Sequence, residues 1–466
     1  MSAVFALTLL QGSAATAQNQ PSDSVAAKPA SDFPHALIPD LIADPSIAFI
    51  EGVIYCYATT DGYGGGLAAS GPPVVWTSRD FLNWSFNGTL FAAGYDGKYW
   101  APSTPVHHDG HYYLYPTLNG KITVVVADRP EGPFRAIDGG GLGKRANPTP
   151  MPITIGKPID AEVFVDDDNQ AYMVWAQRGI GRLKPDLVTF DGPQSTVQTK
   201  RDGYSEGPFL FKRAGVYYYL YTLGGNESYQ YAYMMSRVSP MGPWTAPEQD
   251  IISTTDRAQH IYGPGHGSVF RDPSTNRWYF VYLEYGRGGT TRQVLADRLE
   301  FNPDGSIRPV QVTAAGVGAL RSMPPEPDLA SRAKAYASST LASYKVPART
   351  DRALDRTETY IPGNAIDHSN GTRWMASTAD SDPWFMLDLG AVQRIARTEL
   401  YFVKPTAGHA YLLEYSNDGK RWRPYATQHE LKVQSPHIDH KAVKARYLRL
   451  RVVLGVPGLW EFKVFG

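Results

Sequence analysis

A strand-turn-strand unit recurs five times between residues 44 and 284, and this repeat limits the fold of the chain more than any other feature. The five cores, which align without gaps, are residues 52–57, 110–115, 169–174, 215–220 and 276–281. With their shared tyrosine as the register, the copies lie 58, 59, 46 and 61 residues apart. This period is typical of propeller blades and is too long for helical solenoids. The repeat therefore predicts an all-β, five-bladed β-propeller.

Three of the five copies carry an acidic residue eleven or twelve positions before the shared tyrosine, namely Asp44, Asp160 and Glu206. Each acid alone has an ordinary interpretation as a turn, cap or surface residue. In a propeller, however, the innermost strand of every blade begins at the central channel, so equivalent positions converge. Carboxylates gathered in one pocket repel one another and lose water, which drives their pKa values apart. Because acid and base roles need that difference, the pattern predicts an enzyme.

The composition favours a neutral partner. Lys plus Arg and Asp plus Glu each number 45 among the 466 residues, so nothing indicates binding to nucleic acid. Aromatic residues make up 12% of the chain, and such rings commonly stack on sugars. No stretch after the N-terminus reaches the roughly 18 apolar residues of a membrane span. A polysaccharide or oligosaccharide is the partner that we expect.

The first 17 residues have the pattern of a signal peptide, with a short apolar run and small residues at positions 15–17. A polar spacer follows over residues 18–35. We therefore expect a secreted or periplasmic protein. Cys56 is the only cysteine, and its place inside a strand predicts a core residue.

A second domain is expected after the repeats. The propeller is predicted over residues 36–320, a Pro-rich linker over 321–335, and a β-sandwich over 336–466, where short strands alternate with turns. The second domain contains no cluster of titratable residues comparable to that of the first. It is therefore predicted to bind saccharide and to be dispensable for activity on small soluble substrates.

Four segments carry a resemblance to a known family. Residues 43–47, 100–103, 159–168 and 205–209 resemble the marker segments of glycoside hydrolase family 43. The resemblance spans roughly residues 36–312 and implies a five-bladed propeller that cleaves glycosidic bonds with inversion. It also implies roles for the three acids: Asp44 as general base, Glu206 as general acid and Asp160 as the modulator that orients the acid and raises its pKa. An inverting pair should hold its carboxyls roughly 6.5 to 9.5 Å apart.

Substrate contacts are predicted for three further residues. Trp100 and His266 occupy the channel positions of the second and fifth repeats. The resemblance places Arg292, or Arg287 as the alternative, against the substrate, and a histidine like His266 beside a calcium ion or a water. A core histidine is an equally good interpretation of His266. The run 166–168 reads as a solvated hairpin turn and not as a metal site.

The C-terminal part resembles the coagulation-factor-type discoidin domain, which also occurs as carbohydrate-binding module family 32. The resemblance is carried by residues 365–367, 372–374, 384–390, 416–419 and 461–464, and it implies a jelly-roll β-sandwich. It also implies a structural calcium near Asp367, Thr372 and Glu461. His368 and Ser369 stand where glycine and asparagine are usual. No other cofactor is expected.

The leading hypothesis is an exo-acting, inverting glycosidase that removes arabinofuranosyl, xylosyl or galactosyl units, including galactofuranosyl units. A catalytically silent propeller lectin or adhesin is the first alternative. The second is a retaining enzyme similar to the fructan hydrolases, which also have an early Asp-Pro pair. That family would need asparagines on both sides of the pair and a Glu-Cys pair, whereas this chain has Ala43, Ser46 and Glu206-Gly207.

Overall fold

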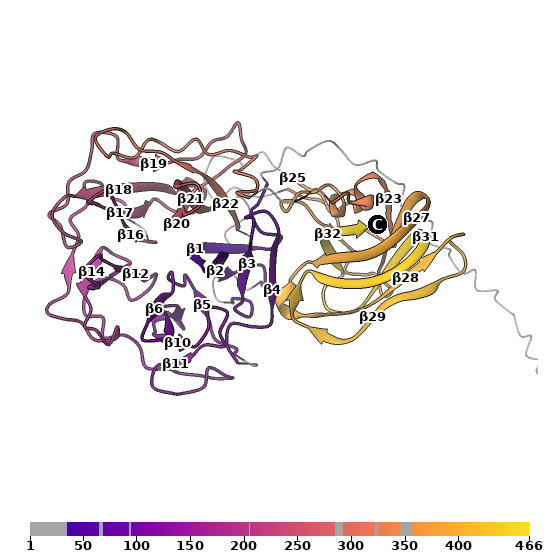
Figure 1. Cartoon of the computed structure of the whole chain (residues 1–466), viewed down its shortest axis with the longest axis horizontal. Helices are drawn as coiled ribbons and strands as arrows, with labels where there is room; N and C mark the ends of the chain where they lie inside the picture. The colour runs from indigo at the N-terminus through magenta and orange to yellow at the C-terminus, as the bar shows by residue number, and fades with distance from the viewer. Residues whose placement is uncertain are drawn as a thin grey trace, which may run out of the picture.

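The computed structural model describes residues 35–64, 69–92, 95–204, 206–284, 292–321, 324, 326–345 and 357–466. They form two β-rich domains that lie against each other (Figure 1). In this part of the chain the only helices are 3-10 turns, at Asn226–Ser228, Leu329–Arg332, Pro362–Ala365 and Pro405–Ala407. None of the described helices is long and apolar enough to cross a bilayer. The predicted all-β class is confirmed, while the expected signal peptide lies outside the described residues.

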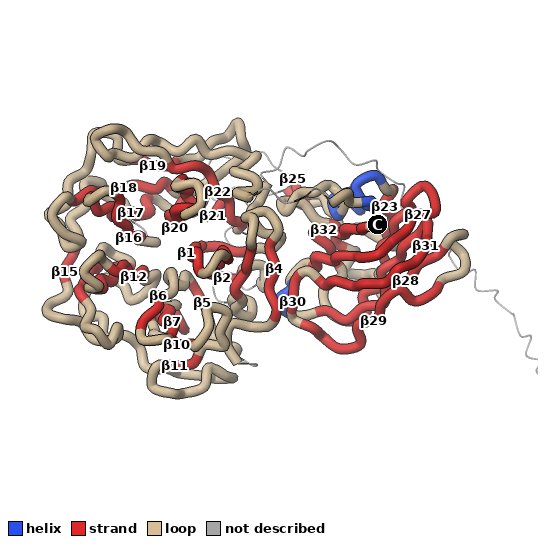
Figure 2. The backbone as a smooth tube through the Cα atoms, in the orientation of Figure 1, coloured by secondary structure: helices blue, strands red, loops and turns tan. Residues whose placement is uncertain are grey.

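Five antiparallel sheets are the blades of the propeller, arranged in a ring (Figure 2). Blade 1 contains β1 (Ile42–Ile50), β2 (Val53–Thr60), β3 (Val75–Ser78) and β4 (Trp84–Asn87); blade 2 contains β6 (Val106–His108), β7 (His111–Leu114), β10 (Val125–Ala127) and β11 (Arg135–Ala136). Blade 3 contains β12 (Glu162–Val165), β13 (Ala171–Trp175), β14 (Gly179–Arg182) and β15 (Ser195–Thr196); blade 4 contains β16 (Phe209–Arg213), β17 (Val216–Leu223), β18 (Gln230–Ser236) and β19 (Ile251–Ser253). Blade 5 contains β20 (Gly265–Asp272), β21 (Arg277–Glu284) and β22 (Gln293–Leu299) among the described residues. A small sheet of β5 (Tyr99–Trp100), β8 (Thr117–Leu118) and β9 (Lys121–Ile122) accompanies blade 2.

The last two residues of each repeated core are buried, because each blade packs between two neighbours. All eight residues of β17 are buried, which explains why its sequence shows a continuous apolar run instead of an alternation. Cys56 is fully buried in β2, as predicted. The ring is closed at its start, where Leu37 N donates to Val294 O at 2.7 Å and joins the N-terminal segment to blade 5.

The second domain is a β-sandwich in which most strands are joined by hydrogen bonds into one continuous sheet. Its strands are β23 (Lys334–Ala337), β26 (Trp374–Met375), β27 (Trp384–Phe402), β28 (His409–Ser416), β29 (Arg423–Lys432), β31 (His437–Leu454) and β32 (Gly458–Phe465), with a separate pair of β24 (Tyr344–Lys345) and β25 (Thr357–Glu358). The long strands β27 and β31 pair along most of their length. Trp374, Phe385, Leu448 and Phe462 belong to the buried core.

Part of the segment predicted as the linker packs against this domain. Ala330, in the turn Leu329–Arg332, is part of the sandwich core. The carboxylate of Asp328 accepts a hydrogen bond of 2.8 Å from Val464 N. Contacts with the sandwich therefore reach back to residue 328. A sequence rich in Pro predicts extension, but it does not tell where packing against a later strand begins.

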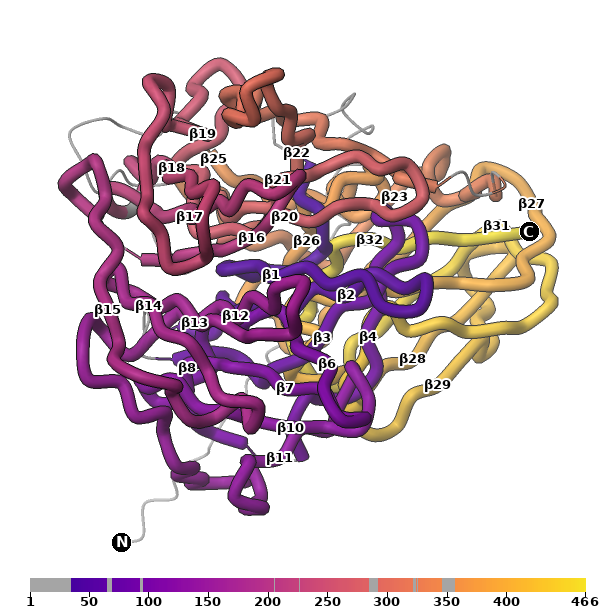
Figure 3. The backbone as a smooth tube through the Cα atoms, turned by 60° about the vertical axis from the view of Figure 1, so that its left-hand side comes forward, coloured from indigo at the N-terminus to yellow at the C-terminus, as the bar shows by residue number. Residues whose placement is uncertain are grey.

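The two domains share a sheet. The short strand β30 (Gln434–Ser435) of the second domain pairs antiparallel with β4, so that the sheet of blade 1 continues across the boundary. Gly88 N adds a hydrogen bond of 2.8 Å to Val433 O. From a second direction, the C-terminal strands β28 and β29 again lie beside β4 (Figure 3). The second domain is therefore docked on the propeller and is not a loosely tethered module.

Candidate active site

Each blade begins its innermost strand with an unusual backbone. At or next to the five equivalent positions, Asp44, Ala101, Asp160, Gly207 and His266 have φ values of 53°, 35°, 58°, 57° and 37°. Strands β1 and β20 also change register there, as bulges do. Bulges and left-handed residues redirect side chains, and such local strain clusters at functional sites. The repeat thus places its special residues together at one end of the channel.

Asp44, the predicted base, is held from three sides. Its Oδ2 accepts a hydrogen bond of 2.6 Å from the Thr59 hydroxyl. Its Oδ1 lies 3.1 Å from Nη1 of Arg292 and 3.2 Å from Nδ1 of His266. Only 6% of the side chain is exposed. These contacts fix the direction of the carboxylate before any substrate arrives.

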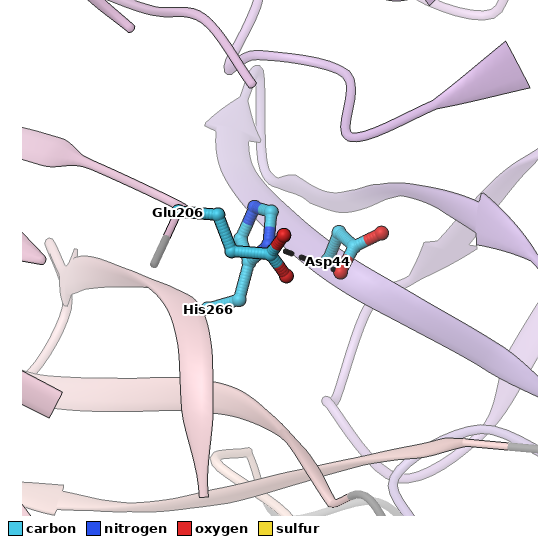
Figure 4. A group of neighbouring side chains, drawn as sticks. All are labelled: Asp44, Glu206 and His266. Atoms are coloured by element: carbon cyan, nitrogen blue, oxygen red, sulfur yellow. Dashed lines mark hydrogen bonds and ion pairs between the residues drawn. The ribbon is translucent and has the colours of Figure 1, made fainter. Parts of the chain in front are cut away.

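Glu206, the predicted acid, lies beside Asp44 and His266 (Figure 4). Its Oε1 accepts a hydrogen bond of 2.7 Å from the Tyr229 hydroxyl and lies 3.4 Å from Nδ1 of His266. The backbone nitrogen of His266 donates to the Thr222 hydroxyl at 3.0 Å, and Thr222 N donates to Glu206 O at 3.1 Å. Thr222 therefore holds the acid and the histidine in a fixed relation.

Asp160 joins the group electrostatically. Its backbone nitrogen donates to the Thr117 hydroxyl at 3.0 Å, and its Oδ2 is buried without a hydrogen-bond partner. Burial raises the pKa of Asp160 to about 7; the positive charge of His266 opposes this rise, and the charges of Glu206 and Asp44 add to it. Burial therefore favours the protonated form of this carboxyl at pH values where a free aspartate is ionised.

His266 determines where the remaining proton lies. Burial lowers its pKa, but the charge of Asp44 and the hydrogen bond with Glu206 outweigh this effect and raise the pKa to about 9. Burial alone would raise the pKa of Glu206, because it disfavours the charged carboxylate. The hydrogen bond and the charge of His266, together with the Tyr229 hydroxyl, outweigh this effect and lower the pKa to about 2. The sequence predicted that Asp160 would raise the pKa of Glu206. In this arrangement the imidazolium has the larger effect, because it contacts the acid directly.

The two acids approach each other beside His266. One oxygen of Asp44, one of Glu206 and Nδ1 of His266 all lie within 4.8 Å of one another. This limit applies to the nearest atoms and not to the separation of the two carboxyl groups, for which an inverting pair is expected to have roughly 6.5 to 9.5 Å. The same three atoms have a spacing that suits a divalent cation, although Arg292 and the proton on His266 compete for the same oxygen of Asp44.

The predicted substrate contacts differ in their surroundings. Arg292 is 5% exposed and donates to both oxygens of Asp61, at 2.9 and 3.2 Å, as well as to Asp44. It is thus engaged by carboxylates of the protein, while its alternative, Arg287, lies outside the described residues. Trp100 ends β5 and is half-buried, with Nζ of Lys98 5.2 Å from its ring centroid.

The sequence analysis missed the contact of Thr59 with Asp44. It expected residues 226–229 near the substrate but not the contact of Tyr229 with Glu206, and no spacing rule points to either contact. Gly207 follows the acid directly, and a Cβ at this position would lie 2.5 Å from the ring of His266. The motif contained this glycine, so its need for close packing could have been inferred.

The predicted ion site of the second domain combines the half-buried Asp367 with the buried Thr372 and Glu461. Thr372 donates its hydroxyl to Asp367 Oδ2 at 2.7 Å, and Ser369 N donates to Asp367 Oδ1 at 3.0 Å. Glu461 is 1% exposed, and neither of its oxygens has a hydrogen-bond partner. Burial, followed by the charge of Asp367, raises its pKa well above the usual range. Buried carboxylate oxygens without partners fit a calcium ion.

Carboxylates that converge on one end of a channel, with different affinities for protons, define the site of a glycosidase. Residues 33–307 match Glycosyl hydrolases family 43, and residues 336–461 match the F5/8 type C domain. The first match covers more than half of the chain, so this protein belongs to glycosyl hydrolase family 43. The predictions of an enzyme, of a propeller and of a discoidin-like second domain are confirmed.

Known relatives differ in the sugars that their names contain. The chain is 28% identical to a β-D-galactofuranosidase of Aspergillus niger over 306 residues, which cover 60% of this chain and 86% of that protein. It is 27% identical to an arabinoxylan arabinofuranohydrolase of Bacillus subtilis over 351 residues, which cover 61% of this chain and 65% of the other. A solved structure described as a glycoside hydrolase is 51% identical, has a TM-score of 0.89, and covers 93% of this chain and 99% of its own.

Proposed function

We propose that this glycosidase is exo-acting and inverting, and that it releases arabinofuranosyl, xylosyl or galactosyl units from polysaccharides or oligosaccharides. The observation that carries the proposal is the convergence of Asp44, Asp160 and Glu206 from three different blades around His266. We assign Asp44 as general base, Glu206 as general acid and Asp160 as modulator of the acid. Arg292 is assigned to the positioning of Asp44, since it bridges Asp44 and Asp61.

The reaction needs one carboxylate that accepts a proton and one carboxyl that gives one. The Asp44 carboxylate takes a proton from a water molecule, whose oxygen attacks the anomeric carbon from the face opposite the leaving group. The bond between this carbon and the leaving oxygen breaks, and that oxygen takes the proton of Glu206. The attack on the opposite face inverts the anomeric configuration. Asp44 ends protonated and Glu206 ends ionised.

Glu206 must hold a proton before it can act, and its neighbours hold the protons of the site. Nδ1 of His266, the group with the pKa of about 9, lies 3.4 Å from Oε1 of Glu206. A proton transfer over this contact gives a neutral imidazole and a protonated carboxyl. A bound sugar would favour this form by excluding water, because desolvation disfavours the charged pair of imidazolium and carboxylate relative to the neutral pair.

A furanosyl substrate is favoured by the names of the two relatives. The ring carbons of α-L-arabinofuranosyl and β-D-galactofuranosyl units have the same configuration, and the two sugars differ in the exocyclic group. The test is a panel of nitrophenyl furanosides and pyranosides, assayed with the wild type and with Asp44→Asn. We expect the wild type to release nitrophenol from at least one furanoside. Asp44→Asn should release none from the same substrate. Activity on pyranosides alone would overturn the furanosyl assignment, and activity on none would overturn the exo assignment.

For the second domain we propose saccharide binding and a calcium ion held near Asp367, Thr372 and Glu461. The support is the pair of unpartnered Glu461 oxygens beside Asp367. A chelator should lower the Tm of the protein and calcium should restore it, whereas Glu461→Gln should abolish the difference. An equal Tm with and without chelator would exclude the ion. We further propose that the protein is exported, as the signal-like N-terminus and a polysaccharide substrate both suggest.

A further inference from the structure

We propose that the C-terminal domain is a positioning element of the active site and that it acts on the orientation of Asp44 through Asp61 and Arg292. The proposal rests on the assignment of Asp44 as the base. Three segments of the propeller surround this residue, and each of them contacts the second domain. The segments are, in the order in which they are described, residues 37–44, 292–293 and 61–63.

The first segment is held by an apolar contact. Leu41, which directly precedes β1 and is 6% exposed, packs in one buried cluster with Tyr401, Val403 and Trp460 of the second domain. Leu41 O accepts a hydrogen bond of 2.8 Å from Asp61 N. The Leu41 side chain also fills the space in which a Cβ of residue 62 would lie, at 2.7 Å. The second domain thus supports both the strand that carries Asp44 and the loop that carries Asp61.

The second segment is held by hydrogen bonds. Gln293 is 2% exposed, and its Nε2 donates to Asn370 O in the second domain at 2.9 Å. The Asn370 side chain in turn donates to Leu37 O at 3.2 Å. Gln293 is the chain neighbour of Arg292, so this contact anchors the backbone from which the arginine extends.

The third segment is held at Tyr63. Its hydroxyl is hydrogen-bonded to the hydroxyl of Thr406, and Nζ of Lys404 lies 5.2 Å from the centroid of its ring. Asp61 lies two residues before Tyr63. The loop that presents the Asp61 carboxylate is therefore fixed from outside the propeller.

The three anchored segments meet at one guanidinium. Arg292 Nε donates to Asp61 at 2.9 Å, and Nη1 donates to Asp44 at 3.1 Å. A shift of Leu41, Asp61 or Gln293 moves the donor that fixes Oδ1 of Asp44. Displacements of about 1 Å in a catalytic group can reduce rates by about a hundredfold. This arrangement opposes the prediction that the second domain is dispensable for small substrates.

Two substitutions in the second domain test the proposal in the full chain. Val403→Ala removes part of the surface under Leu41, and Thr406→Val removes the partner of the Tyr63 hydroxyl. We expect each to lower kcat on a nitrophenyl glycoside by about tenfold with little change in KM, since orientation and not binding is disturbed. Val464→Ala is the matched control, because Val464 is equally buried but belongs to the sandwich core. It should lower the Tm and leave kcat unchanged.

A double substitution identifies the route. If the domain acts through Asp61 and Arg292, then Val403→Ala should reduce kcat no further in an Asp61→Asn background. Unchanged kcat in Val403→Ala and Thr406→Val, in a protein that Asp44→Asn inactivates, would overturn this inference and leave the proposed function intact. Equal losses in Val403→Ala and Val464→Ala would also overturn it, because the effect would then be general destabilisation. Should Val403→Ala not fold, Thr406→Val alone still decides the outcome.

Discussion

Nδ1 of His266 lies 3.2 Å from Oδ1 of Asp44, which brings the last blade of the propeller into contact with the first. The same nitrogen lies 3.4 Å from Glu206. One imidazolium therefore balances the negative charges of both acids (Figure 4). The protonation of the site depends on this histidine more than on any carboxylate, and the behaviour of the enzyme with pH should reflect that.

Replacement of His266 by asparagine should move the alkaline limb of the kcat/KM profile to lower pH. In the wild type the proton shared by His266 and Glu206 is lost only as the pH rises through about 9. Without the imidazole, Glu206 must retain that proton by itself. The profile should be measured on one nitrophenyl glycoside, with the exposed His429→Asn as control. An alkaline limb that stays in place would show that His266 does not govern the acid.

Glu206→Gln should slow substrates with poor leaving groups by about a hundredfold or more. Activated aryl glycosides should lose much less, because their leaving groups need little protonation. Asp44→Asn provides the contrast, since activation of water is needed whatever the leaving group, and both kinds of substrate should then suffer. Equal losses for both kinds of substrate in Glu206→Gln would refute the assignment of the acid.

The sugar released first should carry the inverted anomeric configuration. Family membership supports this expectation, and so does the assignment of Asp44 as a base that acts through water. Proton NMR of the earliest product decides the question. Retained configuration, or a glycosyl group covalently attached to Asp44, would mean that Asp44 is a nucleophile and not a base. The alternative of an enzyme similar to the fructan hydrolases would then be favoured.

The fold should lose stability as the pH rises from about 5 to 8. Burial raises the pKa of Glu162 to about 8, where its carboxylate accepts a hydrogen bond of 2.9 Å from Thr104 N. The unfolded carboxyl ionises near pH 4.5, so its stabilising proton is fully present below that pH and is lost as the pH rises through 8. Each unit of the pKa difference corresponds to about 1.4 kcal/mol.

Thermal unfolding at several pH values tests this prediction with Glu162→Gln, which cannot ionise. The dependence of Tm on pH should become shallower in this variant. The exposed Glu248→Gln should keep the slope of the wild type. A slope that Glu162→Gln does not change would mean that the ionisation of this buried carboxyl does not limit stability.

The repeat made the propeller predictable from sequence, because gap-free cores at blade spacing admit few other folds. It also made Asp44, Asp160 and Glu206 predictable as a group, since register fixes where an innermost strand begins. The side chains that contact these acids were less predictable from the sequence. Thr59 and Tyr229 reach the acids from other strands, and a register does not say which neighbouring side chain turns inward.

The charge state of the site and the relation of the domains were the least predictable. His266 had two equal interpretations, because its role depends on distances of a few ångströms to both acids. The linker suggested separate domains, since composition reveals flexibility but not the surface to which a domain docks. The strand β30 has only two residues, too few for a pattern to indicate pairing with β4.

The pairing of β4 with β30 also restricts how such a protein can evolve or be engineered. The outer edge of blade 1 is covered by β30 of the second domain. An uncovered edge strand has unpaired backbone N–H and C=O groups, to which strands of other chains can bind. Replacement of the C-terminal domain by another saccharide-binding domain would leave β4 unpaired at this edge unless the new domain supplied a strand equivalent to β30. Exchanges that preserve the pairing of β4 with β30 should keep the protein soluble, whereas exchanges that remove it should favour aggregation.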